Sequence, residues 1–187
     1  MPAIGLVISG EKYRWKEIPF EMLAPEYVNA LQKDDREDGF HLSWLTTCPY
    51  RVSKEQIQDY YLHTKSANAM LRGKAWDHLT MAHPRANTLY QETFRRTLNG
   101  VDIIGHPDLI DLDNKCIDDY KSPSRTSQEI SPAYVSQVNG YRWLSAPILA
   151  LRNIVIEKLY INYVGPVEPK RMSIPIWSDQ EVEYFLN

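Results

Sequence analysis

The chain has 187 residues, of which 43% are apolar and 24% charged, and its formal net charge is −3. This composition is typical of a globular protein with its own core, and it excludes a general attraction to polyanions, so nucleic acid could bind only at a local basic patch. The sequence has neither a signal-peptide pattern nor a run of about 18 apolar residues, which predicts a cytoplasmic protein without a membrane span. We expect one domain over residues 1–187, with residues 1–40 as an N-terminal arm.

The first third of the chain predicts short elements and no chemistry. Residues 4–9 form a candidate strand. A helix is expected to start at Ser43 and to break at Pro49, and the next helix to start with Ser53 as its N-cap.

A longer helix is predicted over residues 68–82, because Leu71, Ala75 and Leu79 lie near one helical face. Gly73 lies inside it. Glycine within a helix costs about 1 kcal/mol relative to alanine, so we expect another element to approach the backbone closely there.

Three consecutive antiparallel strands are predicted next, at about 91–98, 101–111 and 116–121. Asn99-Gly100 is a strong signal for a hairpin between the first two strands. If Asp113-Asn114 is the two-residue loop of the second hairpin, Ile110 pairs with Ile117 and Asp108 with Asp119.

That register would place two carboxylates about 5 Å apart, which is unfavourable unless a cation lies between them. Lys121 shares a strand face with Asp119, because side chains two residues apart point the same way. One alternative is an exposed hairpin whose acids are solvated and screened by Lys121. The apolar neighbours Ile110 and Ile117 favour a half-buried hairpin instead, in which a divalent metal joins the carboxylates.

The last part of the chain predicts a helix from Pro132 to about residue 151 and a strand over residues 154–164. Gln137 and Tyr141 are four residues apart on one face of that helix. Ser178 fits the N-cap of a short terminal helix.

Three motifs then occur in a fixed order: Gly105-His106-Pro107-Asp108, Asp119-Tyr120-Lys121 and Gln137-Val138-Asn139-Gly140-Tyr141. In this order the chain resembles the RecB-type branch of the PD-(D/E)XK nuclease superfamily, close to CRISPR-associated and phage exonucleases, over roughly residues 42–164. The resemblance implies an α/β (α+β) fold with a restriction-endonuclease-like core. In that core a mixed central sheet of at least four strands is flanked by helices.

Two departures from the family pattern matter. The family has Gly-x-x-x-His on a helix, whereas here the residue four after Gly73 is Asp77 and the histidine is His78. Either could be the helix ligand, and counting back from Pro84 favours His78. The chain has two cysteines, one of them Cys48, which resembles the first ligand of the family's iron–sulfur cluster. The other cluster ligands are absent, which excludes the cluster.

The resemblance implies phosphodiester hydrolysis with Mg²⁺ or Mn²⁺. The metal would be held by Asp108, Asp119 and the carbonyl of Tyr120, with His78 or Asp77 from the helix. Lys121 would orient or deprotonate a water. Gln137 and Tyr141 would contact the nucleic-acid backbone or order the site. Candidate phosphate contacts are the basic residues Arg72, Lys74, Arg95, Arg96 and Arg125.

The sequence therefore predicts a DNA exonuclease of recombination, repair, or phage and mobile-element DNA processing, in a bacterial, archaeal or phage-infected cell. A second copy or a recombination-complex protein is a candidate partner. The alternative is a catalytically weak or inactive subunit that keeps the nuclease fold for DNA binding or assembly. Its expected signature is loss of Asp108, Asp119 or Lys121, and all three are present.

Overall fold

The computed structural model describes residues 3–9, 15–31, 38–47, 49–57, 60–123, 128–164 and 168–187. The chain forms two compact units. The smaller unit is Met1–Glu37 with Cys48–Ala75, and the larger unit is Asp38–Thr47 with Trp76–Asn187. The sequence predicts residues 1–40 as an arm of one domain and does not predict that residues 48–75 group with them.

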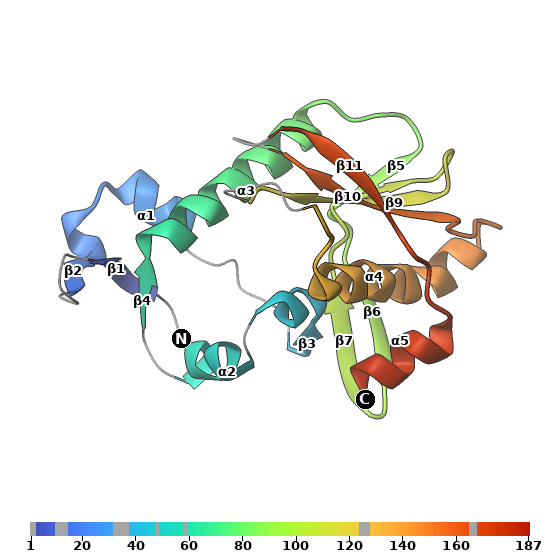
Figure 1. Ribbon diagram of the computed structural model, residues 1–187, viewed down its shortest axis with the longest axis horizontal. Helices are drawn as coiled ribbons and strands as arrows, with labels where there is room; N and C mark the ends of the chain where they lie inside the picture. The colour runs from blue at the N-terminus through green and yellow to red at the C-terminus, as the bar shows by residue number, and fades with distance from the viewer. Residues whose placement is uncertain are drawn as a thin grey trace. The chain divides into compact units, whose positions relative to one another are not determined.

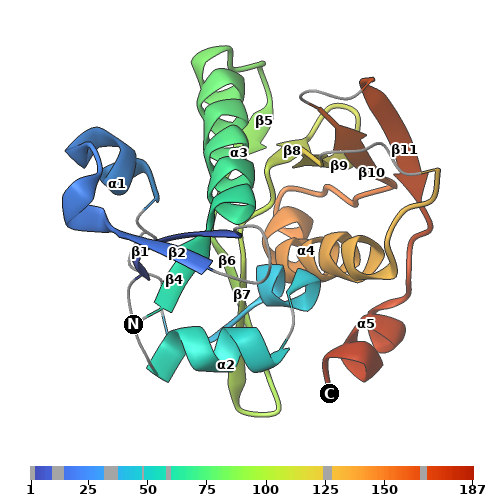
Figure 2. The ribbon, with the colours of Figure 1, turned by 60° about the vertical axis from the view of Figure 1, so that its left-hand side comes forward.

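The smaller unit contains a three-stranded sheet in which β1 (Ala3–Ser9) pairs antiparallel with β2 (Trp15–Pro19) and parallel with β4 (Tyr60–His63) (Figure 2). Leu6, Leu31 and Leu62 form part of its core. Its helical elements are a 3-10 turn, η2 (Phe20–Met22), the helices α1 (Pro25–Leu31) and α2 (Pro49–Ile57), and the first turns of α3 (Thr64–Ala82).

The strand predicted at residues 4–9 is thus confirmed. The N-cap predicted at Ser53 is wrong, because α2 already starts at Pro49, and proline fits the first turn of a helix. The helix predicted from Ser43 is only a 3-10 helix, η3 (Leu42–Thr46).

The larger unit is built on a five-stranded mixed sheet in the order β11-β10-β9-β8-β5 (Figure 1). β9 and β10 are parallel and the other neighbours antiparallel. The strands are β5 (Thr88–Tyr90), β8 (Leu109–Asp111), β9 (Cys116–Lys121), β10 (Lys158–Tyr163) and β11 (Lys170–Ile174). A mixed sheet flanked by helices confirms the predicted α/β (α+β) class.

A second sheet of the larger unit has the order β3-β7-β6, with strands β3 (Phe40–His41), β6 (Phe94–Leu98) and β7 (Val101–Gly105). The continuous strand predicted over residues 101–111 is therefore wrong. It breaks after Gly105, and β7 and β8 belong to different sheets. Pro107 accounts for the break, because proline has no N–H to donate to a ladder.

Helix α4 (Pro132–Ala150) connects the parallel strands β9 and β10, and it starts at Pro132 as predicted. Parallel strands require such a crossover. Val138, Trp143 and Leu144 of this helix are fully buried in the main core. The terminal helix α5 (Asp179–Leu186) begins with the predicted N-cap, Ser178, and forms a complete capping box.

Helix α3 starts four residues earlier than predicted and has no close neighbour at Gly73. A Cβ built there meets no atom within 4 Å in the described part of the chain, so the predicted close approach is wrong. In the described ranges, no helix has the length and apolar character needed to cross a membrane.

Candidate functional site

The hairpin of β8 and β9 has the predicted register. Ile110 pairs with Ile117, and Leu109 with Asp118 is the last pair of the ladder. Asp108 comes directly before this ladder, and it is close enough to Asp119 for the charge of Asp119 to raise its pKa.

The predicted two-residue loop is wrong, since the turn covers residues 112–115. The Asp111 carboxylate accepts hydrogen bonds from the backbone N–H of Asn114 at 2.9 Å and from its Nδ2 at 2.9 Å. Lys115 takes a positive φ of 50°. These contacts stabilise a wider turn without changing the register.

Asp108 lies at the bend before β8, and both of its carboxylate oxygens accept hydrogen bonds. The backbone N–H of Tyr120 donates to Oδ2 at 2.6 Å, and Gln91 Nε2 donates to Oδ1 at 2.8 Å. Burial and the nearby charge of Asp119 raise the pKa of Asp108 to about 7. Gln91 is a further residue of the site. It could not be predicted from the sequence, because a lone glutamine in a loop belongs to no motif.

Asp119 and Lys121 form a buried ion pair on β9. Asp119 is 1% exposed, and Lys121 Nζ lies 2.7 Å from its Oδ2. The approach is poorly angled, so Asp119 Oδ2 has no hydrogen-bond partner among the described residues. Burial raises the pKa of Asp119, and Lys121 opposes this.

Burial alone would lower the pKa of Lys121, but the charges of Asp119 and Asp108 outweigh it and the pKa is raised. Lys121 is therefore an ammonium in the metal-free protein. It also lies 4.9 Å from the ring centre of Tyr134, a cation–π contact that the sequence does not predict.

Helix α4 fixes Lys121 from the other side. Lys121 Nζ donates to Gln137 Oε1 at 3.0 Å, and Gln137 Nε2 donates to the Tyr141 hydroxyl at 2.7 Å. Gly105 makes room for this arrangement, because a Cβ there would lie 2.8 Å from Tyr141 and 2.8 Å from Leu144. The three predicted motifs thus meet in one buried hydrogen-bond chain.

Of the two helix candidates, the structure favours Asp77 over His78. Asp77 is half-buried, and its charge contributes to the raised pKa of Asp108, whereas His78 is exposed. Successive residues of a helix point about 100° apart, so only one of the two can face the site. The positions of the two side chains thus favour Asp77, and the choice between them as metal ligands stays a prediction.

Asp108 and Asp119 offer the hard oxygen ligands that Mg²⁺ and Mn²⁺ prefer, and the nearest cation to Asp119 Oδ2 is the Lys121 ammonium at 2.7 Å. No group of three His, Cys, Asp or Glu side chains within the described ranges is close enough to hold a metal.

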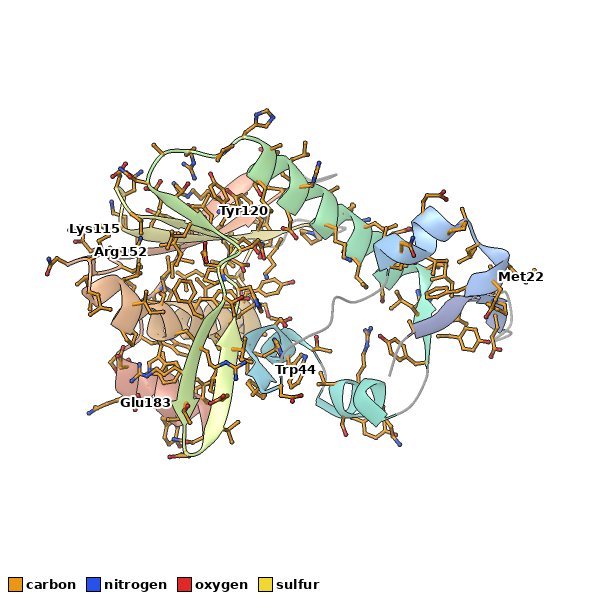
Figure 3. All side chains as sticks on the ribbon, turned by 180° about the vertical axis from the view of Figure 1, so that it is seen from behind. Met22, Trp44, Lys115, Tyr120, Arg152 and Glu183 are labelled. Atoms are coloured by element: carbon orange, nitrogen blue, oxygen red, sulfur yellow. The ribbon has the colours of Figure 1, made fainter. Side chains whose placement is uncertain are left out.

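Two of the predicted phosphate-binding residues have protein partners instead. Arg95 Nη1 lies 2.7 Å from Asp102 Oδ2. Arg96 stacks on Trp143 at 4.0 Å and donates to Glu183 Oε1 at 3.2 Å; Glu183 is labelled on α5 in Figure 3. These contacts do not test the predicted role of the two arginines, which stays a prediction.

The other predicted phosphate contacts are not placed at the site. Arg72 and Lys74 belong to the smaller unit, and Arg125 lies outside the described residues, as does Cys48.

No family model matches the chain, and no curated protein matches it either. Among solved structures, the crystal structure of SSO0001 is similar, with a TM-score of 0.60 and 16% sequence identity. The match covers 86% of this chain and 79% of that chain. At this identity the likeness shows a shared fold alone.

Proposed function

We propose that the protein is a metal-dependent nuclease that hydrolyses phosphodiester bonds of DNA, an exonuclease of recombination, repair or phage and mobile-element DNA processing in the cytoplasm. The observation that carries the proposal is the buried pair of Asp119 and Lys121 beside Asp108 on the adjoining strand. Unpaired buried carboxylates are costly, so a cluster held in this form points to a chemical role. The resemblance to the RecB-type nucleases supports the same reading.

The residues that would hold Mg²⁺ or Mn²⁺ are Asp108, Asp119 and the carbonyl of Tyr120, and Asp77 of α3 would join them only by moving closer. The hydrogen bonds from Gln91 and Tyr120 leave further lone pairs on Asp108, because a carboxylate has about four acceptor sites. Such an ion, when bound, supplies activation of water and neutralisation of phosphate charge.

The chain's own side chains orient the reactants. Hydrolysis adds a water oxygen to phosphorus and breaks one P–O ester bond, so negative charge builds up on the phosphate. The Lys121 ammonium can hold the water and offset that charge, and it is pre-positioned by Gln137, which is fixed in turn by Tyr141. Fixed donors of this kind stabilise a transition state without reorganisation.

The test uses labelled linear and circular DNA, single- and double-stranded, with Mg²⁺ or Mn²⁺. We expect the wild-type chain to degrade linear DNA, and both Lys121→Ala and Asp119→Asn to lose the activity. Lys115→Ala is the matched control, because Lys115 forms an exposed ion pair with Glu157 at 2.6 Å near the other end of the same strand. Equal cleavage by Lys121→Ala would disprove the proposal. DNA binding without cleavage under either metal would favour the inactive-subunit alternative.

A further inference from the structure

A cavity of about 570 Å³ lies on the face of the five-stranded sheet that the proposed catalytic residues do not use. Side chains alternate along a strand, so Asp119 and Lys121 point to one face of β9, and Asp118 and Tyr120 to the other. Asp118 and Tyr120 line the cavity. The cavity is thus separated from the carboxylate site by the thickness of one strand.

Three aromatic residues line this cavity from three different elements: Trp76 from the last turns of α3, Tyr90 from β5 and Tyr120 from β9. Tyr120 is labelled in Figure 3. The Tyr90 hydroxyl accepts a hydrogen bond from the backbone N–H of Arg85 at 2.9 Å, which fixes its ring. Rings held in this way offer flat surfaces on which a planar ligand can stack.

The polar part of the lining is equally fixed. Asp118 is 4% exposed and accepts from Arg171 Nη2 at 2.9 Å, from Arg171 Nε at 3.0 Å and from Asn162 Nδ2 at 2.7 Å. The guanidinium of Arg171 stacks on Tyr160 at 3.7 Å. These contacts hold the polar wall of the cavity in place.

Two guanidinium groups are still open to solvent. The side chains of Arg85 and Arg171 are 55% and 49% exposed. Arg85 lies 3.6 Å from Asp111, beyond hydrogen-bond distance. A guanidinium binds phosphate oxygens in a bidentate fork. Arg171 already forms such a fork with Asp118, so Arg85 is the group that can bind a phosphate at the cavity's rim.

We propose that this cavity binds a nucleotide, with its base stacked among Trp76, Tyr90 and Tyr120 and its phosphate at Arg85. The volume falls within the roughly 300–1,000 Å³ range of small-molecule sites, and aromatic stacking on a base contributes about 1–3 kcal/mol. Bases in a duplex are paired and stacked, so the ligand is an unpaired nucleotide. The inference rests on the proposed function, since it assigns this nucleotide to a single-stranded part of the DNA substrate.

The cavity and the proposed reaction site share one segment of β9, because Tyr120 of the cavity is the neighbour of Asp119 and Lys121 in the chain. Tyr120 stands between Asp119 and Lys121, and its backbone N–H is held by Asp108. A base that packs on the Tyr120 ring would therefore stabilise the backbone segment that carries both catalytic side chains.

The test measures binding of a fluorescent oligothymidylate of about eight nucleotides by anisotropy, with EDTA present so that no cleavage occurs. We expect Trp76→Ala and Tyr90→Ala each to weaken binding about 5- to 150-fold, as the loss of one stacked base predicts. Tyr184→Ala is the matched control, because this tyrosine is 86% exposed on α5. Unchanged affinity in both alanine variants would overturn the inference.

Thymidine monophosphate and blunt duplex DNA serve as competitors in the same assay. Competition by the monophosphate shows that one free nucleotide fills the cavity, and competition by longer single strands alone shows that a chain is required; both support the inference. Equal competition by blunt duplex would contradict it.

Cleavage assays separate this inference from the proposed function. If the wild-type chain cleaves DNA and the Trp76→Ala and Tyr90→Ala variants bind and cleave like it, the inference fails and the nuclease stands. If the wild-type chain binds oligothymidylate through these residues but never cleaves, the nuclease fails and the inference stands.

Discussion

The Lys121 ammonium lies 2.7 Å from Asp119 Oδ2 in the interior of the protein, where the two side chains are 18% and 2% exposed. The same ammonium donates to Gln137 Oε1 at 3.0 Å. A buried pair of this kind adds little net stability, because its attraction has to offset the desolvation of both ions. Removing one partner is nevertheless costly, since the other charge is left alone.

Lys121→Ala should therefore destabilise the metal-free protein by about 3–5 kcal/mol at pH 8. The loss should shrink at pH 5, because Asp108, whose pKa is raised to about 7, is then protonated and needs no counter-charge. Thermal unfolding in EDTA at both pH values measures this. Lys115→Ala should change stability by less than about 1 kcal/mol, as expected of an exposed pair. Equal losses in the two variants would contradict the prediction.

Asp108→Asn should instead raise the stability of the metal-free protein. The folded protein holds a proton on Asp108 up to about pH 7, whereas the unfolded chain releases it near 3.8. The contribution to stability is thus fully present below pH 3.8 and is lost as the pH rises through 7. The neutral asparagine does not suffer that loss.

The midpoint of thermal unfolding of Asp108→Asn in EDTA should consequently exceed that of wild type by roughly 2–8 °C at pH 8 and by less at pH 5. Asp119→Asn is the comparison, and no gain is expected from it because it leaves Lys121 without its closest partner. A wild-type midpoint that is equal to or above that of Asp108→Asn at pH 8 would show that the carboxyl is not strained.

The register of the acidic hairpin could be predicted because Ile110 and Ile117 must both face the core, and a slip by one residue would expose them. The loop could not, because the Asp111 side chain competes with the backbone for the turn. The resemblance implied that Gln137 and Tyr141 contact the nucleic-acid backbone or order the site; in the structure Gln137 accepts from Lys121 and donates to Tyr141.

The features that could not be predicted from the sequence depend on contacts between segments that are distant in the chain. Gln91 reaches Asp108 from a loop 17 residues away, and no local pattern marks it. Arg96 looks like a surface cation, yet Trp143 and Glu183 hold it from two helices that follow much later in the chain. Asp77 and His78 are adjacent on one helix, so only the rotation of that helix decides between them.

Two glycine variants test the packing beneath the hydrogen-bond chain. Gly105→Ala would place a Cβ 2.8 Å from Tyr141 and should cost about 1–3 kcal/mol, together with nuclease activity, because Tyr141 would have to move. Gly73→Ala meets no described atom within 4 Å and should stabilise helix α3 by up to about 1 kcal/mol. Denaturant unfolding and cleavage rates measure both, and a neutral Gly105→Ala would mean that Tyr141 is not tightly confined.

The choice between Asp77 and His78 gives the last prediction. A divalent ion that binds only the folded protein stabilises it by RT ln(1 + [L]/Kd), so the unfolding midpoint rises with the logarithm of the ion concentration once that exceeds Kd. The charge of Asp77 contributes to the raised pKa of Asp108, whereas His78 is exposed. Asp77→Ala should therefore lose most of the midpoint gain that Mn²⁺ produces, and its cleavage rate should fall about 10-fold or more. His78→Ala should keep both. The reverse ranking would return the ligand role to His78, whereas two variants that respond to Mn²⁺ like wild type would show that α3 supplies no ligand and that the metal depends on Asp108, Asp119 and water alone.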